Sequence, residues 1–454
     1  MKTKTFFLLS TLVIFLILSI VSSCKKDDND NGNDNELKKF TISFKDGYIF
    51  DYAWVIINSP DGNTVIDYKK VEGNVNLDFG KIDEESITVT TINVDTSFLN
   101  GQERKYIFIN SYLTSPLGDW VLKGGNTNNQ ILGSADLTMT YPNGIYNEYT
   151  IGTSNSWYSS HVVPNDQINE QFDVYNLDAG NKFSIYGAVL NDNGGYCNWL
   201  IDQNFQLNTT NNYELELNES LDVKNAFSNR PLNYIYLLGC WNQRNSQLLL
   251  YNQMNLNTAS GGEHFHDIIY PFNIPISELY FEGSYYDNNI EYSFGKFYNM
   301  SQGLPDQIDI PEIGISASYN ETNDEITNIQ IDGTADQIDG FWFYFYNSDI
   351  SRFIIYWNVY ADVNYSSIKR PVLPQEIINN IGENINMLEA FYIEIIDFNT
   401  TSNHNEIINR FFIDDIPDMQ LCDECFFSTY LLNQTKNTNI NFNERRMHKI
   451  LNLR

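Results

Sequence analysis

The chain has few basic residues. Its 454 residues include 27 Lys and Arg against 58 Asp and Glu, which gives a formal net charge of −31 at pH 7. Nucleic-acid binding depends on clustered Lys and Arg that neutralise phosphates, and anionic membrane headgroups also attract basic segments. The charge balance therefore excludes nucleic acid as a partner and argues against a protein that lies flat on a membrane surface. Such a balance favours solubility through mutual repulsion.

The motifs of the common enzyme classes are also missing. The sequence contains no nucleophile elbow, phosphate-binding loop, His-Glu-x-x-His helix or Rossmann glycine run. Glycoside hydrolases have no comparable motif, because they need only two suitably spaced carboxylates. With 58 acidic residues in the chain, the sequence does not identify such a pair. We therefore expect a protein that is not an enzyme and uses no cofactor, with a hydrolase as the least favoured alternative.

A long apolar run occurs only at the N-terminus. Lys2 and Lys4 precede an almost unbroken apolar stretch from Phe6 to Val21, which is the layout of a secretory signal peptide. As a helix this stretch would reach about 24 Å, short of the roughly 30 Å hydrocarbon core of a bilayer. We expect residues 1–23 to be a signal peptide that is removed. The alternative is an uncleaved membrane anchor.

The end of this run carries the tetrapeptide Val21-Ser22-Ser23-Cys24. It resembles the lipobox of bacterial lipoproteins, and the acidic stretch that follows Cys24 resembles the export signal of Bacteroidetes-type surface lipoproteins. The resemblance is confined to this N-terminal part of the chain. It implies that Cys24 carries lipid and anchors the protein in the outer membrane, on the outward-facing cell surface. Residues 24–36 are rich in Asp, Asn and Gly, cannot bury a core, and are expected to form a flexible acidic tether.

The rest of the chain has the composition of β-strands. Runs of Tyr, Phe, Ile, Val and Thr alternate with Gly, Asn, Asp and Pro. We expect an all-β fold of tandem β-sandwich domains, with one short helix near residues 374–386. Polar connectors predict the divisions. They delimit a first domain (37–125), a middle β domain that is one unit or two (126–310), a C-terminal β domain (311–434) and a basic tail (435–454).

The first of these domains has the clearest pattern. Seven short strands in so short a stretch are typical of an immunoglobulin-like sandwich, and they are predicted at 40–44, 53–58, 64–68, 74–79, 86–94, 105–113 and 119–122. The turn between the second and third strands, Ser59 to Asn63, contains Pro and Gly and is typical of a hairpin. Trp54 lies in the middle of a predicted strand and is interpreted as a core residue.

Aromatic residues suggest what such a protein could bind. Sugar rings stack on exposed Trp or Tyr, and the candidate stacking residues are Trp342, Trp357, Trp199 and Trp241. Trp342 lies in six successive aromatic residues, 341–346, which predict a central buried strand or a binding face. The architecture resembles that of accessory carbohydrate-binding lipoproteins of outer-membrane polysaccharide uptake systems. We therefore expect a binding module, with polysaccharide as the ligand.

A second class of function stays open. A structural or adhesive envelope protein would use its sandwiches as spacers and bind other envelope proteins through edge strands and the basic tail. The tail could equally be a terminal strand or short helix packed on the last domain. Exposed aromatic platforms would favour glycan binding, and fully buried tryptophans would favour the structural class.

Cysteine and histidine residues offer the remaining chemistry. Apart from Cys24, four cysteines remain in an oxidising envelope, where they could form disulfides or stay thiols; they are Cys197, Cys240, Cys422 and Cys425. The last two could instead be half a zinc site, although no second Cys-x-x-Cys exists. His264 and His266 alternate in a predicted strand and could offer two imidazoles to one metal ion, or they could be ordinary surface residues.

Overall fold

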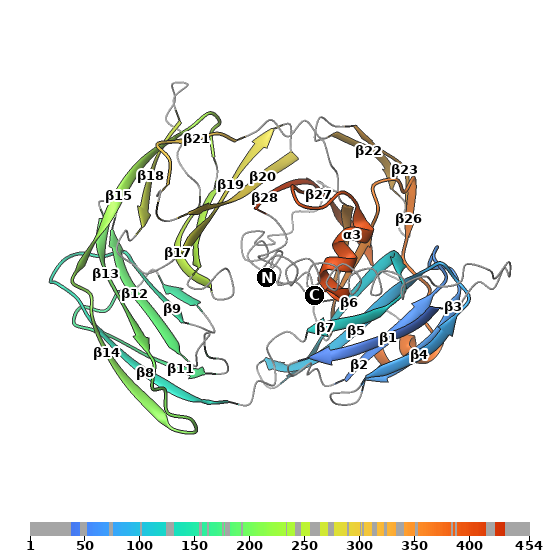
Figure 1. Ribbon diagram of the computed structural model, residues 1–454, viewed down its shortest axis with the longest axis horizontal. Coiled ribbons are helices and arrows are strands. Elements are labelled where there is room, and N and C mark those ends of the chain that lie inside the picture. Colours follow the sequence, from blue (N-terminus) through green and yellow to red (C-terminus); the bar gives the residue numbers. More distant parts are fainter. Residues whose placement is uncertain are drawn as a thin grey trace, which may run out of the picture. The chain divides into compact units, whose positions relative to one another are not determined.

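Among the residues that the computed structural model describes, most lie in strands (Figure 1), so the expected all-β class is confirmed. Residues 1–37 and 432–454 lie outside the described part, and with them the predicted signal peptide, Cys24, the tether and the basic tail. The structure describes residues 38–45, 52–71, 76–99, 102–123, 131–153, 157–160, 163–174, 177, 182–191, 194–232, 234–240, 247–254, 264–270, 277–287, 290–299, 301, 304–310, 316–321, 325–332, 340–349, 353–382, 385, 388–414 and 423–431.

The first seven strands form a two-layered sandwich, and each overlaps a strand predicted from the sequence. They are β1 (Lys38–Lys45), β2 (Tyr52–Asn58), β3 (Val65–Val71), β4 (Leu77–Ile82), β5 (Ser86–Leu99), β6 (Gln102–Pro116) and β7 (Asp119–Lys123). One sheet has the order β4-β1-β7, and the other contains β3-β2-β5-β6. In an immunoglobulin domain the third, sixth and seventh strands share a sheet, whereas here β7 pairs with β1 in the opposite layer. The sandwich is therefore confirmed, with a strand order that differs from the immunoglobulin order.

Apolar side chains of both layers meet in one core. Phe40 and Trp120 of the smaller sheet pack in the same buried cluster as Val55 and Ile57 of β2. Successive side chains of a strand point to opposite faces, so Trp54 enters a second buried cluster on the other side of β2. The interpretation of Trp54 as a core residue is confirmed.

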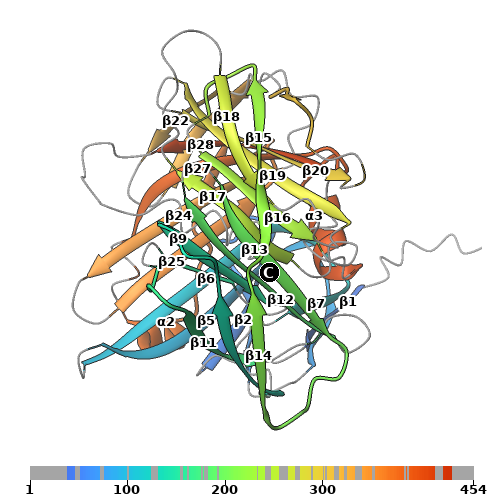
Figure 2. The ribbon, with the colours of Figure 1, turned by 90° about the vertical axis from the view of Figure 1, so that its left-hand side faces the viewer.

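The middle of the chain forms another sandwich, and several of its strands, among them β12, β13 and β14, are labelled in Figure 2. Its strands are β8 (Gly133–Thr140), β9 (Glu148–Thr153), β10 (Trp157–Ser160), β11 (Ile168–Val174), β12 (Phe183–Asn191), β13 (Gly194–Asp202), β14 (Thr210–Glu216), β15 (Glu219–Ser228), β18 (His264–Tyr270) and β21 (Gln307–Ile308). One sheet has the order β11-β8-β14; the other runs β10-β9-β12-β13-β15-β18, with β21 beside β15. Leu137 and Met139 of β8 share a buried cluster with Ile151 of β9 and Ile185 of β12, so the two sheets pack face to face.

The longest sheet joins all three predicted domains. Its order is β17-β16-β19-β20-β28-β27-β24-β25-β6-β5-β2-β3. The strands not yet introduced are β16 (Tyr234–Cys240), β17 (Gln247–Met254), β19 (Glu278–Asp287), β20 (Ile290–Asn299), β24 (Gly340–Asp349), β25 (Phe353–Ala361), β27 (Glu389–Phe398) and β28 (Glu424–Leu431). β25 runs parallel to β6, and the other neighbours are antiparallel. The predicted divisions at 125/126 and 310/311 therefore do not separate sheets.

The run of six aromatic residues lies within β24, which has β27 on one side and β25 on the other. A central position for this strand is thus confirmed, although its side chains lie outside the described part of the structure.

The remaining described elements are a small sheet and short helical segments. β22 (Ser316–Glu321), β23 (Glu325–Asp332) and β26 (Ser367–Lys369) form a small sheet. The predicted helix is α2 (Gln375–Ile381), which starts after Pro374 and buries Ile377 and Ile381. A further short helix, α3 (His404–Ile408), continues into a π-helical turn, η2 (Asn409–Ile413), and was not predicted.

Candidate binding site

A polar pocket of about 580 Å³ lies where five separate segments converge. Two of them come from the first sandwich: the β2–β3 turn and the end of β6. The others are the start of β23, the stretch from the β25–β26 loop through β26, and the start of α3. Loops held by a rigid scaffold are the usual place for binding residues, and this volume lies within the range of small-molecule sites.

The β2–β3 turn places Asp61 at the pocket. As predicted, the segment from Ser59 to Asn63 is a hairpin turn, in which the backbone N–H of Gly62 donates to the carbonyl of Ser59 at 2.8 Å. The carboxylate of Asp61 accepts hydrogen bonds from the hydroxyl of Ser59 and from the side-chain and backbone N–H groups of Asn63. These bonds hold the pKa of Asp61 below its usual value, so this carboxyl is negatively charged at neutral pH.

The β25–β26 loop repeats the same arrangement. One carboxylate oxygen of Asp362 accepts from the backbone N–H of Asn364 at 2.9 Å and from its side-chain amide at 2.6 Å. The other carboxylate oxygen has no hydrogen-bond partner among the residues that the structure describes. Because the turn fixes the side chain through one oxygen, the second is available to a ligand.

Two hydroxyl groups join the loop to the end of β6. Thr114 has an uncommon positive φ of 48°, and its hydroxyl is hydrogen-bonded to that of Tyr365. Burial, followed by the negative charges of Asp362 and Asp61, raises the pKa of Tyr365. Tyr365 therefore remains a neutral phenol in the pocket.

His404 is the most buried polar residue of the lining, with 4% of its surface exposed. Its Nε2 atom lies 3.1 Å from the carbonyl oxygen of Leu113. Burial lowers the pKa of His404 to about 4, against the opposing influence of Asp362. The imidazole is therefore uncharged at neutral pH.

An apolar pocket of about 270 Å³ adjoins this site through Lys369, which lines both. Its lining includes Trp357 and Ile378, and the guanidinium of Arg370 lies 5.7 Å above the Trp357 ring. Arg370 is held in place by a 2.6 Å hydrogen bond to the carbonyl of Ile385.

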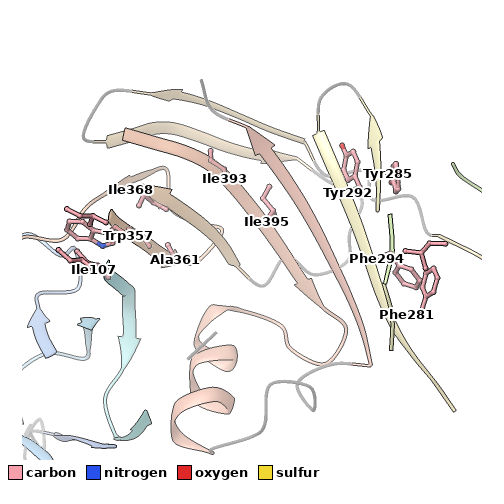
Figure 3. Packing of buried hydrophobic residues seen from close by; sticks show 14 of the residues in the cluster. Ile107, Phe281, Tyr285, Tyr292, Phe294, Trp357, Ala361, Ile368, Ile393 and Ile395 are labelled. Atoms are coloured by element: carbon pink, nitrogen blue, oxygen red, sulfur yellow. The ribbon is translucent and has the colours of Figure 1, made fainter. Parts of the chain in front are cut away.

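The predicted stacking residues do not form an exposed platform in the described part of the chain. Trp357 is only 3% exposed; its indole N–H donates to Ser111 at 2.9 Å, and it packs beside Ile107 (Figure 3). Its role as a stacking residue is thus corrected to that of a core residue. Trp199 is partly buried against the same core. The side chain of Trp342 and the whole of Trp241 lie outside the described residues.

The described cysteines form no disulfide. Cys197, Cys240 and Cys425 are buried thiols, so the disulfide alternative is corrected for these three, and Cys422 lies outside the described residues. Cys240 and Cys425 lie in β16 and β28, which are separated by two strands of the same sheet. With strands about 4.8 Å apart, this separation exceeds the roughly 7 Å limit between bridged Cα atoms.

The proposed metal ligands are placed only in part. His264 and His266 do lie in a strand, β18, opposite Ser228 and Ala226 of β15. Their side chains are outside the described part. Among the side chains that are described, no group of three or more His, Cys, Asp or Glu is arranged to hold a metal ion.

The residues of the polar pocket were not predicted from the sequence. One signal was present: an Asp followed two positions later by Asn occurs at Asp61 and at Asp362, and such Asp residues commonly bond to the backbone two residues on. Asp and Asn are so abundant here that this signal alone could not have selected these two positions.

Comparisons with known proteins give no further guide. The chain matches no protein-family model and no curated protein sequence. Within the described residues no helix has the length and apolar character needed to cross a membrane.

Proposed function

We propose that this protein is a lipid-anchored surface protein of the outer membrane that binds glycans and does not transform them. Its anchor would be the lipid on Cys24, followed by the acidic tether 24–36. The observation that carries the binding function is the polar pocket at the junction of the β2–β3 turn, the β25–β26 loop and α3.

The pocket has the chemistry that sugar hydroxyls require. Carboxylate, amide and hydroxyl groups line it, among them Asp61, Asp362, Asn405 and Ser367. Asp61 and Asp362 are each fixed by hydrogen bonds within their own turns, so binding does not have to order them. Such preorganisation lowers the entropic cost of binding.

Affinity gel electrophoresis tests this function. Protein made without residues 1–23 and carrying Cys24→Ser would run through gels that contain different polysaccharides. We expect at least one polysaccharide to retard the protein, and Asp362→Asn to weaken the retardation about tenfold, since a hydrogen bond to a charged group contributes roughly 1.5–3 kcal/mol. Glu84→Gln is the matched control because Glu84 is an exposed acid that does not line the pocket.

If every polysaccharide that retards the wild-type protein retards the Asp362→Asn variant equally, the glycan site lies elsewhere in the protein. Uniform mobility across a broad panel would contradict glycan binding and favour the second candidate.

That second candidate is a structural or adhesive protein with protein partners. Trp54, Trp120 and Trp357 are all buried, and β3 ends the long sheet with Ile66 and Tyr68 exposed. An exposed strand edge can add a strand from another protein. Replacement of Ile66 by Lys should then reduce cell–cell adhesion without changing the glycan gels.

The anchor is tested separately. Cells fed radiolabelled palmitate should label the wild-type protein and not the Cys24→Ser variant. External protease should digest the wild-type protein on intact cells if it faces outward. Equal labelling of both proteins would contradict lipidation at Cys24.

A further inference from the structure

The polar pocket contains a carboxylate oxygen that can accept a hydrogen bond from a ligand. Asn63 and Asn364 each donate a side-chain N–H group to the carboxylate of their own turn, Asp61 and Asp362 respectively. The second carboxylate oxygen of Asp362 has no partner among the described residues. A ligand that pairs with this oxygen must bring a hydrogen-bond donor.

His404 adds a further acceptor. A carbonyl oxygen can only accept a hydrogen bond, so the contact with Leu113 requires the proton of the neutral imidazole to be on Nε2. Nδ1 then carries a lone pair, and it forms no hydrogen bond with any residue in the described part. His404 is thus almost fully buried and at the same time lines the pocket.

The charges of the residues that line the pocket also favour a ligand that donates hydrogen bonds and carries positive charge. Asp61, Glu325 and Asp362 are acidic, and Lys369 is the one basic Lys or Arg in the described lining. Lys369 forms no ion pair with a described residue, and it is exposed. The pocket therefore has a negative balance, which attracts a positively charged ligand and repels an anionic one.

We infer that the pocket is specific for an amino sugar, with the ammonium group near Asp362 and the hydroxyl groups donating to the remaining acceptors. This inference rests on the proposed glycan-binding function and names the class of glycan. An ammonium group provides three donors and one positive charge, which matches both the unpaired oxygen of Asp362 and the negative balance of the lining. A uronic acid would bring a carboxylate into the same space and would be excluded.

Isothermal titration tests the specificity. Protein made without residues 1–23 and carrying Cys24→Ser would be titrated with glucosamine oligomers, with N-acetylglucosamine oligomers and with galacturonate oligomers, each at two salt concentrations. The N-acetylated oligomers match the first ligand in shape and lack its charge. We expect the glucosamine oligomers to bind at least about tenfold more tightly than the acetylated ones, and the galacturonate oligomers not to bind.

Two variants separate the pocket from the general charge of the protein. Asp362→Asn should weaken glucosamine binding about tenfold, whereas Glu84→Gln removes the same charge outside the pocket and should change it less than about twofold. Lys369→Met should strengthen glucosamine binding about two- to threefold, because it removes the opposing charge. Misfolding cannot produce this gain.

The outcomes separate the proposed specificity for amino sugars from the proposed glycan-binding function. If acetylated or galacturonate oligomers bind as tightly as glucosamine oligomers, the proposed specificity for amino sugars is wrong. If their binding is also lost in the Asp362→Asn variant, the pocket is still a glycan-binding site. If Asp362→Asn and Glu84→Gln weaken glucosamine binding equally, and if salt abolishes that binding, the ligand is attracted by net charge alone and the inference is wrong. Binding that requires added calcium and is lost with a chelator would also overturn it. No binding of any glycan would contradict the proposed function itself.

Discussion

At the scale of single residues, the β2–β3 turn depends on the backbone freedom of one glycine. Gly62 has a φ of 73°, a conformation that disfavours a side chain. A Cβ at this position would also come within 3.2 Å of Pro371. The turn that holds Asp61 is thus fitted closely against the segment that follows β26.

Replacement of Gly62 by Ala tests this fit. Gly80 is a matched control because it has the same φ of 73°, and a methyl group added there would meet nothing within 4 Å. We expect Gly80→Ala to lower the free energy of unfolding by about 1 kcal/mol, and Gly62→Ala to lower it by about 2 kcal/mol. Urea denaturation measures both, and equal losses would contradict a close contact with Pro371.

His404 makes stability depend on pH. Its pKa falls from an ordinary value of 6.5 to about 4 in the folded protein, so between these values the unfolded chain binds more protons. The stabilising contribution is complete above pH 6.5 and is lost as the pH falls to 4, by about 3 kcal/mol. His404→Gln cannot ionise and should show a smaller loss of unfolding free energy between pH 7 and pH 4.5 than wild type. An equal loss in both would show that other groups cause the pH dependence.

At the scale of elements, the parallel pairing of β25 with β6 joins the third part of the chain to the first. Side chains from the two strands meet on both faces. Asn358 donates to Asn110 at 2.8 Å, and the indole of Trp357 donates to Ser111 at 2.9 Å. The rings of Phe108 and Tyr356 stack at 5.1 Å. Parallel strands cannot be joined by a short turn, so these contacts determine the register in place of a hairpin.

The Trp357–Ser111 bond is buried, which makes its loss measurable. Trp357→Phe should lower the free energy of unfolding by about 1–3 kcal/mol. A double-mutant cycle with Ser111→Ala should give a coupling energy of about 1 kcal/mol. A coupling near zero would contradict the bond.

Local sequence patterns predicted strands, turns and helices well, but they did not predict which strands pair with each other. The seven strands of the first sandwich, the turn at Asp61 and the helix after Pro374 each have a local signal in turn residues or apolar spacing. The pairing of β25 with β6 has none, because it joins residues far apart in sequence. Trp357 illustrates the same limit: its position in a strand was predictable, but not its burial against Ile107 of a distant strand.

At the scale of the whole molecule, the described residues from Lys39 to Leu431 belong to one compact unit. A single sheet carries strands from each of the three predicted domains. Breaking any part of it would expose strand edges and core in the neighbouring part. The polar pocket is itself a product of this continuity, because its lining comes from both the first and last thirds of the described chain.

Unfolding should accordingly be cooperative. We expect scanning calorimetry to give one transition whose calorimetric and van't Hoff enthalpies agree. Three separate transitions would indicate that the divisions at 125/126 and 310/311 mark independent domains after all.

Carboxyl footprinting would show whether the polar pocket is where a glycan binds. Carbodiimide would modify exposed acids with and without the polysaccharide that retards the protein, and mass spectrometry would locate the change. We expect lower modification of Asp362 and Glu325 with ligand and unchanged modification of Asp83 and Glu84, which lie outside the pocket. Unchanged modification of Asp362 and Glu325, with protection at other acids, would contradict glycan binding in this pocket.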